Sequence, residues 1–281
     1  MDKTRLDDLP SQTISFETVT VDACGEVISR RSAAAQLALQ ALCPDVTLEL
    51  IWIPPGSFVM GARPGEGFED ELPQHHVRLG GLWMARYPVT QAQWRAVMGS
   101  LPPCRCRSDD LPVDRVSWHD AQAFCSRLSN LSGRAYRLPA EAEWEYACRA
   151  GTRTPFAFGE TLTTDLANYV GEHIFRSEPK GSYRHVATKG GTFPPNAYGL
   201  GDMHGNVWEW CADDYHLNYL GAPSDGRPWY MARARERVLR GGCWHDPPWL
   251  CRSAARLAQP PGEAEDYFGF RVALDPLQPG A

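Results

Sequence analysis

The 281-residue sequence has no long apolar run. Its longest uncharged stretches, such as residues 33–43, are well short of the roughly 20 apolar residues that a membrane-spanning helix needs. The first ten residues, MDKTRLDDLP, mix charges and have neither the apolar centre nor the small-residue cleavage site of a secretory signal. We therefore expect a cytoplasmic protein without a membrane partner.

Positive charge is also scarce. The 28 Lys and Arg residues face 34 Asp and Glu residues, which gives a net charge of −6 at pH 7. A nucleic-acid-binding surface needs a surplus of positive charge on one face, because it must neutralise phosphates. The charge balance therefore excludes DNA and RNA from the expected partners.

The nine cysteines include no C-x-x-C pair. This absence disfavours zinc ribbons and thioredoxin-like redox sites, and an odd number leaves at least one thiol unpaired in any disulfide scheme. The close pair Cys104 and Cys106 lies beside two prolines and is interpreted as loop thiols. The adjacent carboxylates of Asp213 and Asp214 are interpreted as a solvated pair and not as an acid–base site.

The chain divides into an N-terminal extension, a core domain and a short tail. The extension, residues 1–45, alternates apolar and polar residues over 13–21, which predicts a strand that could pair within the chain or between chains. Its Ala/Leu/Gln-rich stretch at 32–42 predicts a helix. Residues 46–275 have short apolar runs interrupted by Gly, Pro, Asn and Asp, which is typical of short strands joined by turns. Residues 276–281 form the tail.

Three helices are predicted within the core domain. The first, over 90–98, has a Thr cap with Gln three residues later. The second, over 117–128, has Ser and Asp at its positive end, and a shorter one follows over 140–149. Beyond residue 150 helix signals are rare, so irregular coil and short strands are expected there, with loops fixed by buried Trp rings or bound cations.

Six phrases of the sequence are more particular than its composition. In their order, and over roughly residues 48–273, they resemble the formylglycine-generating-enzyme, or sulfatase-modifying-factor, superfamily. The resemblance implies an α/β, C-type-lectin-like formylglycine-generating-enzyme fold with sparse secondary structure, few helices and long ordered loops. The phrases are IPPGSFVMG at 53–61, YPVTQAQW at 87–94, RLPAEAEWEY at 137–146, GNVWEW at 205–210, RGGCW at 240–244 and GFR at 269–271.

This superfamily contains enzymes and non-enzymes. Its oxidases convert a substrate cysteine with two cysteines that follow the RGG phrase and hold copper. Here the corresponding segment holds Cys243 and Cys251, is shorter, and lacks the enzymes' closely spaced pair. No catalytic residue or catalytic cofactor is therefore expected, although a soft-metal thiolate site at these two cysteines stays an alternative. Residues 1–45 contain no His, which excludes the iron-binding helical domain of the sulfoxide-synthase branch.

The C-terminal phrases also resemble the variable proteins of diversity-generating retroelements, in which fixed framework residues alternate with residues rewritten by reverse transcription. The framework here is RGGCW, CRSA at 251–254, Arg256 and GFR, within a variable-type region of about 240–271. Exposed substitutions cost little stability, so such a scaffold can present changing side chains. Trp208, Trp210 and Trp244 are expected in the core, whereas Trp249, Tyr267 and Phe268 are expected as surface anchors. The resemblance implies that a protein ligand binds His245, Asp246, Pro247, Trp249, Leu250, Ala255, Leu257, Gln259, Asp266, Tyr267 and Phe268.

Residues 202–209 match a segment that forms a calcium site in this family. Calcium prefers hard oxygen ligands, and a glycine permits the turn that gathers them. The resemblance therefore implies a structural calcium ion. Its ligands would be the carboxylates of Asp202 and Glu209 and the main-chain oxygens of Gly205 and Val207, and a second site would begin at Asn168 and Tyr169.

The hypothesis is a non-catalytic ligand-binding protein, a variable protein of a diversity-generating retroelement that displays variable residues on a calcium-stabilised C-type-lectin scaffold. Two alternatives stay open. One is a copper- or thiol-dependent formylglycine-generating oxidase. The other is a fixed interaction module that residues 1–45 link to signalling effectors, because relatives outside retroelements share the same framework.

Overall fold

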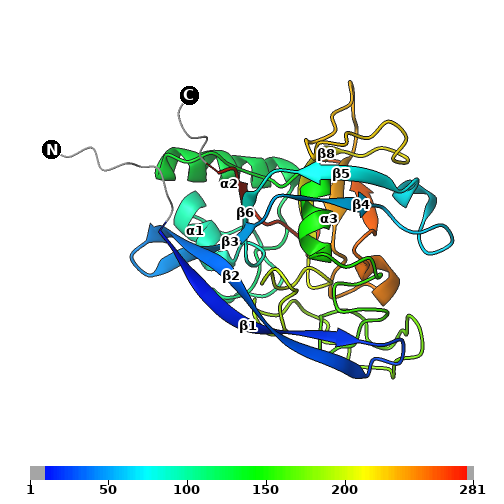
Figure 1. Cartoon of the computed structure of the whole chain (residues 1–281). Helices are drawn as coiled ribbons and strands as arrows, with labels where there is room; N and C mark the ends of the chain where they lie inside the picture. Colours follow the sequence, from blue (N-terminus) through cyan, green and yellow to red (C-terminus); the bar gives the residue numbers. More distant parts are fainter. Residues whose placement is uncertain (1–9, 277–281) are drawn as a thin grey trace.

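The structure is a computed structural model that describes residues 10–276 (Figure 1). Its largest sheet has six strands in the order β1-β2-β3-β6-β12-β7. Because β12 pairs with both β6 and β7, the last strand of the chain lies inside a sheet made otherwise of early strands. These strands are β1 (Ser11–Val21), β2 (Val27–Cys43), β3 (Val46–Ile53), β6 (Leu82–Ala85), β7 (Tyr136–Arg137) and β12 (Ala273–Leu274).

Two smaller sheets complete the strand inventory of the described chain. A four-stranded sheet in the order β10-β9-β8-β11 carries the C-terminal phrases, and β4 pairs with β5 in a two-stranded sheet. Long loops join these elements, as expected. The strands are β4 (Gly56–Met60), β5 (His75–Leu79), β8 (Trp208–Asp214), β9 (Arg237–Arg240), β10 (Arg256–Gln259) and β11 (Phe268–Gly269), with short 3-10 turns at η1 (Glu69–Glu71) and η2 (Pro248–Cys251).

The three predicted helices of the core domain are confirmed as α1 (Gln91–Met98), α2 (Trp118–Ser132) and α3 (Glu141–Arg149). The predicted caps hold α1 and α2: the N–H of Gln93 donates to Thr90 Oγ1, and the N–H of Asp120 donates to Ser117 Oγ. The second helix runs four residues further than predicted and ends at Gly133, whose φ is 70°. Within residues 10–276, none of the helices is long and apolar enough to cross a membrane.

The N-terminal extension is a hairpin within the main sheet. The predicted strand over 13–21 is confirmed as part of β1, which pairs within the chain. The predicted helix over 32–42 is wrong, because these residues belong to β2, which hydrogen-bonds to β1 on one side and to β3 on the other. Two ladders satisfy its backbone, so tertiary pairing overrides the helix preference of Ala, Leu and Gln. Ala38 is completely buried in this arrangement.

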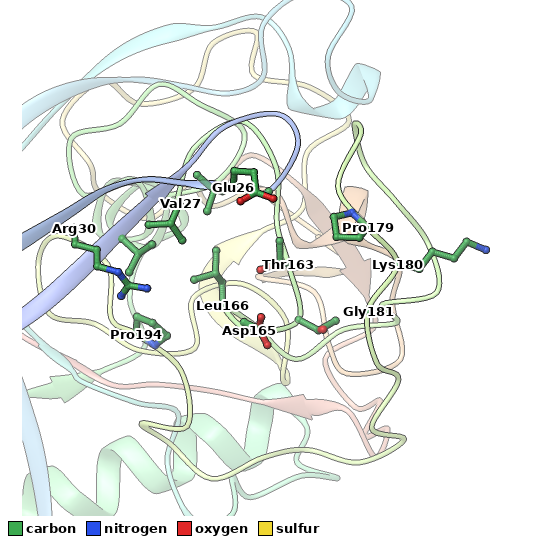
Figure 2. A pocket seen from close by; sticks show the side chains of 14 residues that line it. Glu26, Val27, Arg30, Thr163, Asp165, Leu166, Pro179, Lys180, Gly181 and Pro194 are labelled. Atoms are coloured by element: carbon green, nitrogen blue, oxygen red, sulfur yellow. The ribbon is translucent and has the colours of Figure 1, made fainter.

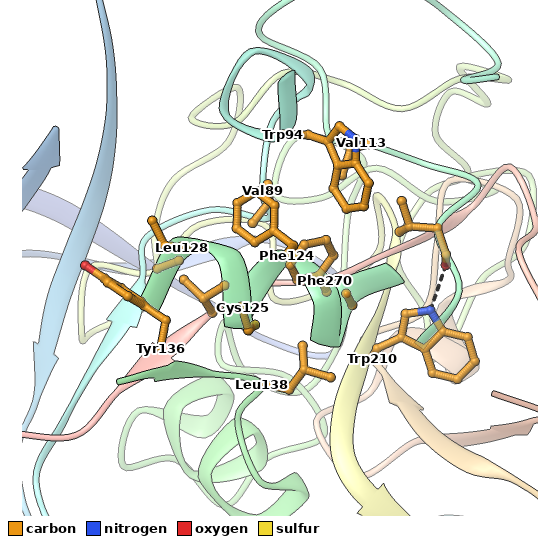
Figure 3. Packing of buried hydrophobic residues seen from close by; sticks show 14 of the residues in the cluster. Val89, Trp94, Val113, Phe124, Cys125, Leu128, Tyr136, Leu138, Trp210 and Phe270 are labelled. Atoms are coloured by element: carbon orange, nitrogen blue, oxygen red, sulfur yellow. Dashed lines mark hydrogen bonds between the residues drawn. The ribbon is translucent and has the colours of Figure 1, made fainter. Parts of the chain in front are cut away.

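Aromatic packing forms the largest core cluster, between α1, α2 and the C-terminal segment (Figure 3). The ring of Phe124 stacks on Trp94 at 5.6 Å and meets Phe270 edge-on at 5.2 Å. The indole N–H of Trp210 donates to the carbonyl of Val116 at 2.9 Å, so the buried polar atom is satisfied. The expectation that Trp208, Trp210 and Trp244 lie in the core is confirmed, since none is more than 3% exposed.

Buried ion pairs bind the C-terminal phrases to the rest of the domain. Each of four Arg residues after residue 239 reaches a buried carboxylate, and no member of these pairs is more than 5% exposed. Because the carboxylates lie on α3, η1 and β8, the pairs join segments that are far apart in the sequence. The pairs are Arg240–Glu145, Arg252–Glu71, Arg256–Glu141 and Arg271–Glu209, the last three at 2.6 Å.

Removing one buried member of these pairs should destabilise the domain strongly. We expect Arg240→Ala to lower the free energy of unfolding by about 3–5 kcal/mol, because Glu145 Oε2 loses its ion-pair partner and the carbonyls of residues 253–255 lose their buried donor. The exposed pair Arg30–Glu17 is the control, and Arg30→Ala should cost no more than about 1 kcal/mol. Urea unfolding of both variants tests this, and equal costs would show that the buried pairs do not hold the domain together.

Candidate ligand-binding surface and cation site

The RGG phrase makes the turn on which the candidate surface is built. Gly241 and Gly242 have φ values of 102° and 73°, a region that glycine adopts without strain. A Cβ on Gly242 would lie 2.6 Å from Cys251 Sγ, so η2 packs directly on this turn. The turn therefore leads from buried β9 to the residues before η2.

Two of the predicted ligand-binding residues, His245 and Trp249, are exposed on this turn and on η2. Nδ1 of His245 lies 2.7 Å from the hydroxyl of Tyr183, and its ring stacks on Tyr267 at 6.3 Å. The ring of Trp249, which is 37% exposed, meets His173 edge-on at 5.5 Å. The surface is therefore built from two separate segments of chain.

A third segment reaches this surface from the loop of Cys104 and Cys106. The guanidinium of Arg105 lies 4.6 Å above the ring of buried Trp244 and donates to Asp266 at 2.7 Å. No sequence motif marks Arg105, Tyr183 or His173, so sequence reasoning missed them. We call the group of Arg105, His173, Tyr183, His245, Trp249 and Tyr267 the display surface.

The remaining predicted ligand-binding residues differ in accessibility. Pro247, Leu250, Leu257, Gln259 and Asp266 are half-buried. Ala255 and Phe268 are completely buried, so their prediction as ligand-binding residues is wrong.

Strand pairing explains the burial of Phe268. Phe268 lies in β11, which pairs with β8, and its ring meets Trp210 at 5.5 Å.

Asp246 accepts hydrogen bonds from Trp208 Nε1 at 2.6 Å and from the N–H of Cys243 at 3.1 Å. Burial raises the pKa of Asp246. This side chain holds the turn in place and is not a free surface group.

The two cysteines of the alternative copper site are buried free thiols. Burial raises the pKa of Cys243 and of Cys251 well above the ordinary thiol value. The thiol of Cys243 donates to Asp246 Oδ2 at 3.1 Å. Copper binds the thiolate, so both protons would have to leave. Among residues 10–276, no three or more His, Cys, Asp or Glu side chains are arranged to hold a metal ion.

Another buried cysteine, Cys148, lies with its Sγ 3.7 Å from Nε2 of His204. The histidine is fully engaged, because Nδ1 donates to the carbonyl of Cys251 at 2.8 Å and Nε2 accepts from the N–H of Ala157 at 3.0 Å. Burial lowers the pKa of His204 to about 4 and raises that of Cys148 to about 12. The pair supplies neither a thiolate nor a free base, so it is part of the core.

The interpretation of Asp213 and Asp214 as a solvated pair is wrong, because both are buried. Asp213 accepts from the N–H groups of Glu141 at 2.7 Å and Trp229 at 2.8 Å, and burial raises its pKa to about 8. Asp214 pairs with Arg237 at 2.6 Å. Both carboxylates fix the loop that follows β8.

The expected calcium segment has unpartnered oxygen atoms. Asp202 has φ 58°, and neither of its buried carboxylate oxygens has a hydrogen-bond partner. The N–H of Gly191 approaches this carboxylate without reaching normal hydrogen-bond geometry, and burial raises the pKa of Asp202 to about 7. Oδ1 of Asn168 is also buried without a partner. Unpartnered buried oxygens are costly, so both side chains fit a cation with oxygen ligands.

The other residues of the expected calcium sites have different surroundings. Both carboxylate oxygens of Glu209 accept from Arg271, and one also accepts from Trp144 Nε1 at 2.7 Å. The two expected sites are neighbours, because the N–H of Asn206 donates to the carbonyl of Asn168 at 2.8 Å, and Asn168 forms a bridge with Gly205. Tyr169 and Val207 are buried beside them. Asp202 and Asn168 thus offer free oxygens, whereas Glu209 is shared with Arg271.

A cavity of about 390 Å³ lies between the β1–β2 hairpin and residues 163–181 (Figure 2). Val19, Val21 and Leu166 form apolar walls, and the acidic side chains of Glu26 and Asp165 lie on opposite sides. The hairpin is docked here because the N–H of Val21 donates to the carbonyl of Phe158 at 2.7 Å. The N-terminal extension therefore shapes part of the protein surface.

The chain is similar to the members of one known protein family. The profile of the family described as sulfatase-modifying factor enzyme 1-like domain matches residues 40–276. The formylglycine-generating enzyme of Bos taurus is 33% identical over an alignment of 229 positions that covers 79% of this chain and 58% of that enzyme. The serine/threonine-protein kinase pkn1 of Chlamydia caviae is 33% identical over an alignment of 253 positions that covers 80% of this chain and 38% of the kinase. The chain thus spans 38–58% of the length of these relatives.

Two solved structures have the same fold. PvdO from Pseudomonas aeruginosa aligns with a TM-score of 0.74 at 33% identity, over 85% of this chain and 98% of PvdO. Treponema denticola variable protein 1 aligns with a TM-score of 0.73 at 25% identity, over 85% of this chain and 99% of that protein. These relatives include an enzyme and a variable protein. The chain therefore belongs to the sulfatase-modifying factor enzyme 1-like family of the formylglycine-generating-enzyme superfamily, and the expected C-type-lectin-like fold is confirmed.

Proposed function

We propose that this chain is a non-catalytic ligand-binding protein of the variable-protein kind, which presents side chains of region 240–271 on a fixed scaffold. The observation that carries the proposal is the separation of roles along this region. The Arg residues of its phrases are buried in ion pairs, whereas His245 and Trp249 between them are exposed. Side chains can therefore change at the surface while the scaffold stays in place.

The chemistry of the display surface favours a protein ligand. Aromatic rings and Arg are enriched at the centres of protein interfaces. The rings bury much area with few rotatable bonds, and the guanidinium of Arg offers several hydrogen-bond donors in a fixed plane. The display surface holds Arg105, two Tyr, one Trp and two His. His245 and Tyr183 also hold each other through a hydrogen bond, which lowers the entropy lost when a ligand binds.

The oxidase alternative has less support. Its metal would need Cys243 and Cys251 as thiolates, and both are buried as neutral thiols. Closure of η2 on the RGG turn leaves Cys251 completely buried. A substrate cysteine would therefore meet neither sulfur without a rearrangement of the turn.

The fixed interaction module keeps one observation in its favour. The Chlamydia caviae kinase contains a region similar to this chain within a longer protein. A gene beside a reverse transcriptase and a near-copy of its own 3′ end would favour a diversified protein. A gene lacking both neighbours would favour the fixed module.

An aldehyde assay separates binding from oxidation. We expect no formylglycine when the purified chain is incubated with copper, reductant and a cysteine-containing sulfatase peptide, because neither thiol is ionised or accessible. The product is measured by mass spectrometry against a reaction without protein. Aldehyde formed by the native chain but not by a Cys243→Ser, Cys251→Ser variant would reject the proposal.

Substitutions on the display surface should hardly change stability. We expect His245→Ala to change the free energy of unfolding by no more than about 0.5 kcal/mol, because this side chain is exposed, and Trp249→Ala, whose ring is 37% exposed, to cost no more than about 1.5 kcal/mol. Phe268→Ala, a buried control in the same region, should cost about 3–5 kcal/mol. Urea unfolding measures all three. If His245→Ala and Trp249→Ala lowered the free energy of unfolding as much as Phe268→Ala does, the display surface would be part of the scaffold.

A calcium ion at Asp202 is part of this proposal. Asp202, in the expected segment 202–209, would hold it, and its charge would stabilise the buried carboxylate; Asn168 would belong to the second expected site. We expect the melting temperature to rise with calcium and to fall with EGTA; saturation at about 100 times Kd is worth about 2.7 kcal/mol.

The matched variants for this test are Asp202→Asn and the exposed Asp165→Asn. The first should abolish the calcium response, and in EGTA it should be at least as stable as the native chain, since it removes an unpaired charge. The second should respond like the native chain. If neither calcium nor EGTA changed the melting temperature of the native chain, a bound calcium ion at Asp202 would be excluded.

A further inference from the structure

A second cavity, of about 300 Å³, lies away from the display surface. It opens between β4 and the C-terminal end of α3. The cavity has aromatic, hydroxyl and cationic side chains in its lining, and no Asp or Glu. Its lining includes Ser57, Phe58, His76, Tyr146, Arg153 and Tyr198.

Three aromatic rings form one side of this cavity. Tyr146 is in the middle, with its ring 5.4 Å from Phe58 and 5.7 Å from Tyr198, each tilted by 55°. The hydroxyl of Tyr198 donates to that of Tyr146 at 3.1 Å, and Tyr146 donates to the carbonyl of Pro54 at 3.2 Å. Hydrogen bonds thus fix both tyrosines. Tyr146 is only 6% exposed and supports the other two rings, so the half-buried rings of Phe58 and Tyr198 offer the prepared surface for a flat apolar group.

The charge around this cavity is positive. Arg153 is exposed and makes no ion pair within residues 10–276, and His76 also lines the cavity. Arg149, which also lines the cavity, belongs to the buried cluster on α3. In that cluster the three guanidinium groups of Arg149, Arg240 and Arg256 face the two carboxylates of Glu141 and Glu145, which leaves one positive charge. Burial raises the pKa of Asp213, which lies beside this cluster, to about 8, so its negative charge is reduced near neutral pH.

We propose that this cavity binds a small organic anion that carries an aromatic ring. The ring would lie on Phe58 and Tyr198, which Tyr146 supports from below, and a phosphate or carboxylate group would pair with Arg153, whose planar guanidinium suits either. The volume lies at the lower end of the range for ligand pockets, about 300–1,000 Å³, which limits the ligand to a small molecule. The site is independent of the display surface and of calcium.

Calorimetric titration of the full chain with phenyl phosphate tests this proposal. We expect phenyl phosphate to bind at least about tenfold more tightly than inorganic phosphate or phenol, because only phenyl phosphate uses both the rings and Arg153. Arg153→Ala should weaken binding about tenfold, and Ser57→Trp should abolish it by filling the cavity from an exposed position on β4.

Arg127→Ala is the control, because Arg127 is an exposed arginine on α2 that does not line the cavity. It should bind phenyl phosphate like the native chain. No binding of phenyl phosphate to the native chain would overturn the proposal. So would equal binding of phosphate alone, or equal binding by the Arg153→Ala and Ser57→Trp variants, since the anion would then be held elsewhere.

Discussion

Buried guanidinium–carboxylate pairs are the interaction on which this fold depends. Regular hydrogen-bond ladders are short in the C-terminal half, where β11 and β12 have two residues each. Arg240 shows what replaces them: besides Glu145, its guanidinium binds the carbonyls of Ser253, Ala254 and Ala255. One side chain thereby fixes a loop that has no ladder of its own. Burying such charges costs desolvation energy, and their benefit is a unique arrangement of loops.

In the RGG turn, inward-facing and outward-facing side chains alternate, so one stretch of sequence can supply both a scaffold and a surface. Asp246 and Cys243 face inward and hold the turn, while His245 between them faces solvent. Neighbouring residues therefore have different roles, one in the scaffold and one at the surface. The alternation between the two roles does not follow the period of a strand or a helix. This explains why the predicted ligand-binding residues included Ala255 and Phe268, which the structure buries.

Local signals in the sequence predicted local structure well. The Thr90 and Ser117 caps marked two helices, because capping is decided by residues within one turn. The Ala-rich stretch at 32–42 misled because its partners, β1 and β3, lie outside the stretch. The family phrases located the framework, but the contributions of Arg105, Tyr183 and His173 depend on loops that meet only in the folded chain. No periodicity or spacing encodes such meetings, so that part of the site could not be predicted.

The position of β12 has a consequence for how the protein is made. This strand inserts between β6 and β7, so the largest sheet stays divided until Ala273 and Leu274 have left the ribosome. The segment from 240 to 271 is translated just before them. Any change there that shifts the reading frame or stops translation also deletes the strand that joins the sheet. Only a chain translated in frame through β12 can therefore complete the largest sheet.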